Sequence, residues 1–313
     1  MRAHRRTGRC SARWSGAWAR TWATWTRCCS PTPIPVHRLT IAARELSAAN
    51  LDQRLHLTGP RDELTELSDT FDQMLSRLEA AFQSQRRFIA NASHELRTPL
   101  AIMRTELDVT LDKGQPGAGQ LRSMGEVIRT AVTRSERLVD GLLALAESER
   151  GIEHAEPVDL ASLVAPGLAL VADSARAAGI RLTTDLASAP VTGTRVLLER
   201  LAENLADNAV RHNQPGGWLT ITTARHGDIA ELRVENSGPR ITLDQAATLF
   251  EPFRRLHPDR VNSARGSGLG LSIVRAVARA HDGDATATPM AAGGLRVTVA
   301  LPAAPRDEAA ARR

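Results

Sequence analysis

The chain has 313 residues, 42% of them hydrophobic, which is enough for two or more packed units. Its net charge of +5 does not indicate nucleic-acid binding, because nine arginines precede the first acidic residue, Glu45, and account for more than the whole of it. All three cysteines lie within the first 29 residues, which excludes a disulfide framework or a cysteine zinc site in the rest and suits a reducing compartment.

The first 34 residues form a basic leader in which four tryptophans recur at helical spacing: Trp14, Trp18, Trp22 and Trp25. Such a helix could lie on a membrane surface, or the segment could be a poorly ordered tail or a mis-assigned gene start. We find neither the roughly 20 apolar residues that cross a bilayer nor the apolar core of a signal peptide. We therefore expect no membrane-spanning segment in this chain.

Helical patterns follow, first over residues 39–46 and then, after a connector at 50–60, over a much longer segment. Its apolar residues alternate in steps of three and four, as in a heptad seam, with the polar Gln85 interrupting before the last: Leu64, Leu67, Phe71, Met74, Leu78, Ala81 and Phe88. The glycine-rich stretch 112–119 ends this helix, and a second carries Ile128, Ala131, Ser135, Leu138, Leu142 and Leu145. Since two such helices bury little alone, we expect a four-helix bundle formed by a homodimer.

A histidine, His94, lies on the first of these helices and is followed by Glu95, Thr98 and Pro99. Proline five residues on predicts a bend just beyond the histidine. Glu95 can take a proton from one ring nitrogen and leave the other to attack phosphorus, while Thr98 could orient a water for hydrolysis. A solvated acid, a helix-face hydroxyl and a simple kink remain the alternatives. A His-Glu-x-x-His zinc site is excluded, because Thr98 stands at its second histidine.

Past residue 151 the pattern mixes helices with strands, predicted at 180–186, 219–223, 231–235 and 296–301. The helix around 195–212 places Asn204 and Asn208 one turn apart beside an apolar stripe. Two amides so arranged can present oxygens to magnesium and donors to phosphate, or they can simply be polar residues at a helix edge.

A glycine run, Gly266-Ser-Gly268-Leu-Gly270, opens a helix that extends to about His281. Glycines let the backbone approach a polyphosphate, and a helix N-terminus offers amide donors. The spacing is not that of a dinucleotide fingerprint. The preceding loop could cover the phosphates or be an exposed arginine-rich loop; it carries Phe250, Phe253, Arg254, Arg255, Arg260 and Arg265.

From residue 35 to 302 these segments resemble, in order, the cytoplasmic part of a bacterial sensor histidine kinase. Residues 35–85 resemble its HAMP relay module and the His94 run its phosphoacceptor box. The segments 204–208, 236–241, 250–253 and 266–270 resemble its N, first glycine, F and second glycine boxes.

The resemblance implies an α plus α/β fold. Residues 86–150 would form a helical-hairpin dimerisation domain, which becomes a four-helix bundle in the dimer. Residues 151–305 would form an α/β-sandwich ATPase domain of the gyrase and chaperone type, followed by a tail at 306–313. It implies His94 as phosphorylated nucleophile, Glu95 as base and Thr98 as a phosphatase residue. ATP and Mg²⁺ are the implied cofactors, with Asn208 and Asn204 as metal ligands. The implied nucleotide-binding residues are Asn204, Asn208, Arg211, Asn236, Gly238, Phe253, Gly266, Gly268, Leu269 and Gly270.

Two departures from the family pattern stand in the first glycine box. Asn236 replaces the common aspartate, and Arg240 replaces the second glycine. Asn236 keeps a carbonyl acceptor for the adenine amino group but loses the charge, so we expect weaker ATP binding that still persists.

The function so implied is ATP-dependent autophosphorylation on His94 and transfer to an aspartate of a response regulator, with phosphatase activity open. The expected partners are a receiver domain and a second copy of the chain, without nucleic acid, and with N-terminal membrane association left open. The catalytic part is expected in the cytoplasm of a family usually anchored in the inner membrane. A non-catalytic dimeric scaffold is the alternative, which the two departures would favour.

Overall fold

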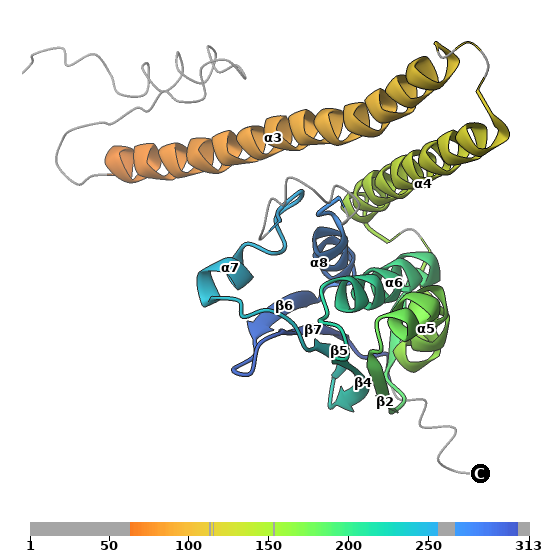
Figure 1. The fold of residues 1–313 in the computed structure, drawn as a ribbon. Coiled ribbons are helices and arrows are strands. Elements are labelled where there is room, and N and C mark those ends of the chain that lie inside the picture. The colour runs from red at the N-terminus through yellow and green to blue at the C-terminus, as the bar shows by residue number, and fades with distance from the viewer. Residues whose placement is uncertain (1–62, 113, 115, 153, 256–266, 306–313) are drawn as a thin grey trace, which may run out of the picture. The chain divides into compact units, whose positions relative to one another are not determined.

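The computed structural model describes residues 63–305 apart from 113, 115, 153 and 256–266. The leader, the helix expected at 39–46 and Gly266 lie outside the described residues. The chain divides into two compact units between Arg87 and Phe88. The helix α3, Glu63–Leu111, runs across this boundary (Figure 1).

The second half of α3 and the helix α4, Ala118–Glu149, form the predicted hairpin, with the turn at the glycine-rich stretch. An ion pair between Glu95 and Arg134 joins the two helices. Pro99 lies inside α3, which continues to Leu111, so the proline does not end the helix. The bend expected beyond His94 stays a prediction.

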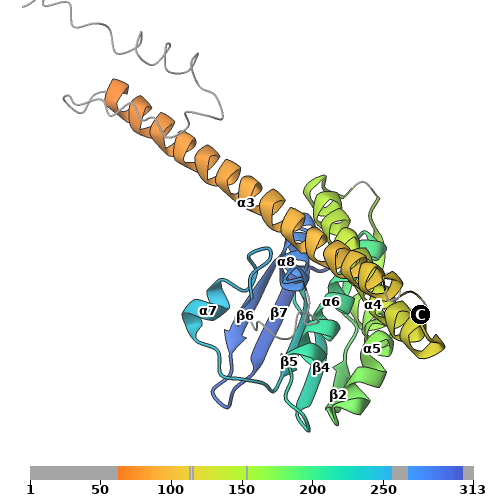
Figure 2. The same cartoon turned by 45° about the horizontal axis from the view of Figure 1, so that its top comes forward.

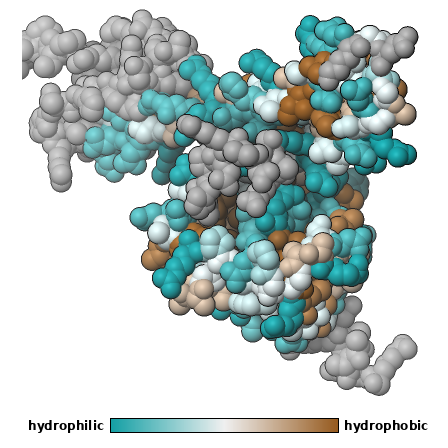
Figure 3. Space-filling view, viewed as in Figure 1, coloured by the Kyte–Doolittle hydropathy of each residue, from teal (hydrophilic) through white to brown (hydrophobic). Residues whose placement is uncertain are grey.

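Two residues of the seam predicted on α4 are already covered within the chain. Ala131 and Leu138 are buried within the chain, and Leu138 belongs to the core shared with the following domain. A different stripe of large apolar residues is exposed on the hairpin, with the same steps of 11, 7 and 4 on both helices: Ile89, Leu100, Leu107 and Leu111 on α3, and Leu121, Val132, Val139 and Leu143 on α4. Figure 3 shows hydrophobic residues at the surface of the hairpin. In the first unit the predicted seam is exposed at Leu67, Met74 and Leu78.

A two-layer α/β sandwich follows the hairpin (Figure 2). Its five-stranded sheet has the order β2-β4-β5-β7-β6, with β2 parallel to β4 and the other pairs antiparallel. The strands are β2 Arg181–Leu186, β4 Trp218–His226, β5 Ile229–Asn236, β6 Asp284–Pro289 and β7 Leu295–Pro302. The helices are α5 Leu160–Ala177, α6 Arg195–Arg211, α7 Leu243–Ala247 and α8 Gly270–Ala280, and β1 Glu156–Asp159 pairs with β3 Pro190–Gly193.

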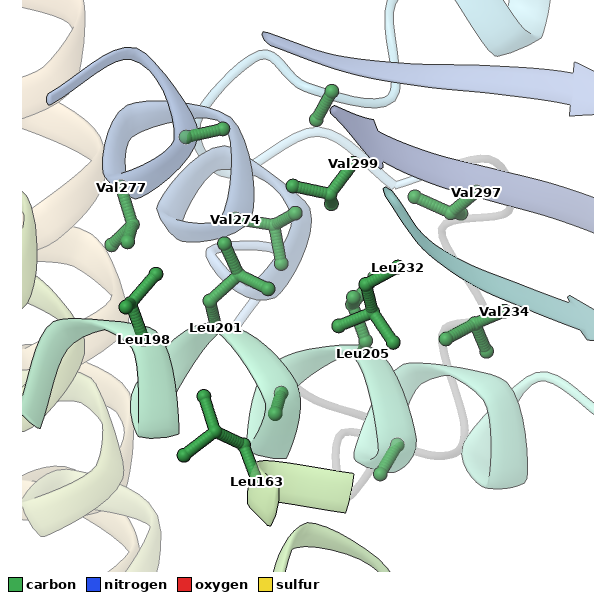
Figure 4. Packing of buried hydrophobic residues seen from close by; sticks show 14 of the residues in the cluster. Leu163, Leu198, Leu201, Leu205, Leu232, Val234, Val274, Val277, Val297 and Val299 are labelled. Carbon is green, nitrogen blue, oxygen red and sulfur yellow. The ribbon is translucent and has the colours of Figure 1, made fainter. Parts of the chain in front are cut away.

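Alternation along β4, β5 and β7 gives the sheet one buried face, which α5, α6 and α8 cover. Leu198, Leu201 and Leu205 project from α6 into this core, where they meet valines of α8 and leucine and valines of the strands (Figure 4). Each buried leucine stabilises the fold by about 1.5–3 kcal/mol. The core therefore fixes the position of α6, and the polar edge of that helix faces away from this packing.

The four strands predicted from alternation are confirmed to within a few residues as β2, β4, β5 and β7. The strands β1, β3 and β6 had not been predicted. β6 reads Asp-Ala-Thr-Ala-Thr-Pro, whose small side chains give almost no hydrophobic signal.

The helix α5 bears on the expectation that this chain has no membrane-spanning segment. Among the described residues it alone is long and apolar enough, by composition, to cross a membrane. In this structure α5 belongs to the sandwich, because five of its residues are buried and its Gly167 lies close to the backbone of Ala202 on α6.

Candidate functional site

A cavity of about 880 Å³ opens at one end of the sandwich. The edge of α6, the first turn of α8, the segment after β5 and one face of α4 line it. Seven of the residues predicted to bind nucleotide or metal meet there: Asn204, Asn208, Arg211, Asn236, Gly268, Leu269 and Gly270. Segments that lie up to 66 positions apart in the chain thus converge on one pocket.

The edge of α6 presents its polar residues to the cavity at intervals of one turn. The Nδ2 group of Asn204 donates to the carbonyl of Arg200 at 2.7 Å, which leaves its Oδ1 beside the start of α8. Asn208 follows one turn later. Arg211 pairs with Asp207 at 2.7 Å, so the aspartate holds the guanidinium at the cavity wall.

The glycine loop needs its glycines for two separate reasons. Gly268 has φ +74°, and a Cβ there would lie 2.9 Å from the backbone carbon of Phe253. The amide of Phe253, itself at φ 64°, donates to the carbonyl of Gly268 at 3.0 Å. A Cβ at Gly270 would stand 3.2 Å from Oδ1 of Asn204. The loop therefore packs directly against the F box and the N box, and the first turn of α8 faces the cavity with its amides.

Asn236 lies at the end of β5 and is 4% exposed. Its Nδ2 donates to the carbonyl of Ser237 at 2.9 Å, an orientation that leaves Oδ1 as the acceptor. Gly238 does not itself line the cavity, but a Cβ there would press on the carbonyl of His212 at 2.8 Å. Gly238 thus packs the first glycine box against the end of α6.

Two glycines at the tip between β6 and β7 had been missed. Gly293 and Gly294 have φ +93° and +97°, and a Cβ on Gly294 would lie 2.0 Å from the carbonyl oxygen of Asn236. Gly294 also lines the cavity. The adjacent pair of glycines before a strand was the available signal.

The cavity wall is strongly cationic. Seven arginines line it against three carboxylates: Arg129, Arg134, Arg137, Arg200, Arg211, Arg254 and Arg255, against Asp140, Glu203 and Asp207. Burial raises the pKa of Glu203, an effect that Arg200 opposes and Glu199 reinforces. Such a wall suits a polyanion, and a polyphosphate fits both this charge and the glycine loop.

The face of α4 that closes the cavity is packed against α8. A Cβ on Gly141 would lie 3.2 Å from Ile273 and 3.4 Å from Leu269, which is the residue between the two loop glycines. Asp140 of α4 also pairs with Arg200 of α6 at 3.8 Å. The sequence had assigned α4 only to the hairpin, so its part in the cavity wall was missed.

His94 is exposed on α3 and does not line the cavity. Among the described residues its ring has no hydrogen-bond or ion-pair partner. The hydroxyl of Thr98 donates to the carbonyl of His94 at 3.1 Å. The carboxylate of Glu95 accepts from Nη2 of Arg134 at 2.8 Å and so points at α4. The structure therefore presents the imidazole to incoming groups, while the expected base is held by an arginine.

These features define a class of protein: a nucleotide-binding sandwich joined to an exposed histidine on a helical hairpin. Family models agree along the chain. Residues 35–80 match the HAMP domain, 84–151 the His Kinase A (phospho-acceptor) domain, and 193–305 the histidine kinase-, DNA gyrase B- and HSP90-like ATPase.

Individual relatives agree as well. The chain is 48% identical over 270 residues to the sensor protein CutS of Streptomyces coelicolor, which is 86% of this chain and 65% of CutS. It superimposes on the Acinetobacter baumannii histidine kinase AdeS with TM-score 0.53 and 26% identity, over 67% of this chain and 97% of AdeS. The histidine kinase ThkA, in a complex with the response regulator TrrA, shares the fold with TM-score 0.56 and 20% identity. The match covers 79% of this chain and 70% of that one.

The chain belongs to the sensor histidine kinases. It spans about two thirds of the length of CutS.

Proposed function

We propose that this chain is an ATP-dependent protein histidine kinase that phosphorylates itself on His94 and passes the phosphoryl group to an aspartate of a separate response regulator. The observation that carries the proposal is the cationic cavity in which the predicted N and glycine boxes meet, joined within one compact unit to an exposed His94. The match to the ATPase family supports ATP as the nucleotide.

The transfer step places each residue in a defined role. One nitrogen of the neutral His94 ring attacks the γ-phosphorus, a nitrogen–phosphorus bond forms, the bond to the bridging oxygen breaks and ADP leaves. Glu95 accepts the proton from the other ring nitrogen. The amides at the start of α8 and the cavity arginines stabilise charge on the phosphates.

Asn236 would recognise the adenine. Its Oδ1 can accept from the adenine amino group, because its Nδ2 is committed to the Ser237 carbonyl. Among the described residues no group of three His, Cys, Asp or Glu could hold a metal alone. An amide oxygen of Asn208, with Asn204 beside it, fits a hard cation whose other ligands are phosphate oxygens, and magnesium bound there would neutralise phosphate charge.

A homodimer would complete the hairpin. The exposed stripes on α3 and α4 form an unpartnered apolar surface of the kind that a four-helix bundle buries. We propose a relay module to about residue 85, the hairpin to about residue 150 and the ATP-binding domain beyond it, with the catalytic part on the cytoplasmic side of a membrane-anchored sensor.

Phosphatase activity on the partner regulator is a second proposed function. Thr98 lies one turn from His94, and its exposed hydroxyl bonds only a backbone carbonyl, so it can turn to orient a water. Phosphate loss from a phosphorylated regulator should slow with Thr98→Ala while the labelling of His94 by ATP persists.

The kinase proposal is tested with γ-labelled ATP and magnesium on the wild type and two variants. We expect label on the wild type, none on His94→Gln, and none on Asn208→Ala, because the last cannot hold the nucleotide with magnesium. Calorimetry separates the two failures: His94→Gln should bind ATP as the wild type does, and Asn208→Ala should not. Label that persists on His94→Gln would contradict the proposal.

A further inference from the structure

Arg134 touches two functional regions of the molecule. Its Nη2 donates to Oε2 of Glu95 at 2.8 Å, across the hairpin and 39 residues away in the chain. The same side chain lines the cavity that holds Asn208 and the glycine loop. Both partners of the ion pair are largely covered, with side-chain exposures of 21% for Arg134 and 27% for Glu95. Such a pair is far better defined than an exposed one.

The ion pair holds Glu95 away from the neighbouring histidine. Successive residues on a helix point about 100° apart, so Glu95 reaches the His94 ring only if its side chain turns along the helix surface. In this arrangement it points toward α4. Arg134 is the polar partner of its carboxylate among the described residues, and the ring of His94 has none. Glu95 is thus not engaged as a base here.

The nucleotide phosphates would compete for the same guanidinium. Arg134 projects from the face of α4 that also brings Arg129 and Arg137 to the cavity. Phosphate oxygens accept charge-assisted, bidentate hydrogen bonds from arginine, and a triphosphate carries more charge than one carboxylate. A nucleotide in the cavity therefore draws Arg134 away from Glu95.

We propose that Arg134 is a positioning residue that couples nucleotide binding to the chemistry at His94. It exchanges the Glu95 carboxylate for the phosphate groups of the nucleotide, and Glu95 then turns to accept the ring proton of His94. The inference rests on the proposed kinase function and adds to it the way in which occupancy of the cavity activates the acceptor histidine.

The coupling can be read without phosphoryl transfer, through the reactivity of the exposed imidazole. Diethyl pyrocarbonate acylates the unprotonated ring nitrogen, and a Glu95 hydrogen bond to the other nitrogen makes that attack faster. The full chain is treated with and without the β,γ-imido analogue of ATP plus magnesium, and acylation of His94 is followed by peptide mass spectrometry.

We expect the analogue to raise the acylation rate of His94 several-fold in the wild type. Arg134→Gln should react at the fast rate without the analogue, and Glu95→Gln at the slow rate with or without it. Arg137→Gln is the matched control, since it removes another cavity arginine of α4 and should lower nucleotide affinity without speeding acylation on its own.

Labelling by γ-labelled ATP supplies the second readout. Arg134→Gln should need more ATP for half-maximal labelling than the wild type, because its guanidinium binds the phosphates. An unchanged ATP requirement would show that Arg134 does not bind the nucleotide phosphates, and would overturn the inference. Equal acylation rates with and without the analogue, in a wild type that labels normally, would overturn the coupling and leave the kinase function standing. A wild type that is not labelled by ATP would contradict both the kinase function and the coupling through Arg134.

Discussion

The hairpin and the sandwich of this chain place a histidine in opposite settings. His94 on the hairpin is exposed and its ring has no hydrogen-bond partner among the described residues. His281 in the sandwich is 4% exposed, with Nδ1 against the carbonyl of Val277 at 2.8 Å and Nε2 accepting from the amide of Thr194 at 3.1 Å. A reactive imidazole needs an open lone pair, whereas a structural one uses both nitrogens.

The surroundings of the two histidines follow the same division. Most of the buried apolar core lies in the sandwich, while the hairpin exposes ten large apolar side chains, eight of them in two matching stripes. The sandwich therefore has its core within one chain, whereas the hairpin leaves two apolar stripes exposed.

The sandwich should lose stability when a closely packed glycine is replaced by alanine. Gly294→Ala puts a Cβ 2.0 Å from the carbonyl oxygen of Asn236 at φ +97°, so we expect a loss of about 3 kcal/mol or more of unfolding free energy. Gly227→Ala is the control, because φ is +63° but nothing lies within 4 Å, and it should cost only about 1–2 kcal/mol. Denaturant unfolding measures both, and equal losses would contradict the packing described.

The hairpin should fail by losing its partner rather than its fold. Leu143→Glu places a charge on the exposed stripe of α4, and burial of that charge in a dimer should raise the dimer dissociation constant about 100-fold or more. Sedimentation equilibrium measures the change. Val196→Glu, equally exposed but on α6 of the sandwich, should leave association unaltered. If both variants associate like the wild type, the stripe is not the dimer surface.

The buried histidine should make the sandwich sensitive to acid. Burial lowers the pKa of His281, against smaller opposing effects of the Val277 carbonyl and Asp282. The pKa of a histidine in the unfolded chain is about 6.5. Just below that pH the unfolded chain therefore binds a proton at His281, whereas the folded chain does not. Stability is therefore complete above that pH and falls as the pH drops through it.

Thermal melts between neutral and mildly acidic pH test this. His281→Leu should lower stability at neutral pH, since the Thr194 amide loses its acceptor, by about 1 kcal/mol, and should flatten the acid-side slope. The exposed His226, when changed to leucine, should preserve that slope. An unchanged slope in His281→Leu would show that other groups cause the acid sensitivity.

The junction of the two regions should contribute least. Asp140 and Arg200 lie 3.8 Å apart with side chains 48% and 42% exposed, so solvent screens their attraction. A double-mutant cycle with Asp140→Asn and Arg200→Gln should give a coupling of only about 0.2–1 kcal/mol. A coupling well above this range would make the ion pair, rather than the apolar packing at Gly141, the main link between α4 and the sandwich.

Sequence reasoning predicted most of the sandwich and named seven of the residues that line its cavity, because alternation and local motifs carry that information. Asn204 and Asn208 on one edge of α6 are an example, since helical periodicity alone places them together. Contacts between segments far apart in the chain could not be predicted from periodicity and local motifs. The ion pair of Glu95 with Arg134 and the packing of Gly141 on Leu269 depend on how α4 meets its neighbours. For the same reason the sequence could not show what covers each residue of the α4 seam, since Leu138 is apolar whether a second chain or the sandwich covers it.

The most direct test of the account is the location of the phosphate. Trypsin releases Phe88–Arg97 as one peptide that contains His94 and a single hydroxyl side chain, Ser93. After brief incubation of the full chain with ATP and magnesium, we predict that this peptide gains the mass of one phosphoryl group, located on His94, stable to base and lost in acid. Phosphate on Ser93, or on any other peptide with Phe88–Arg97 unmodified, would contradict the account.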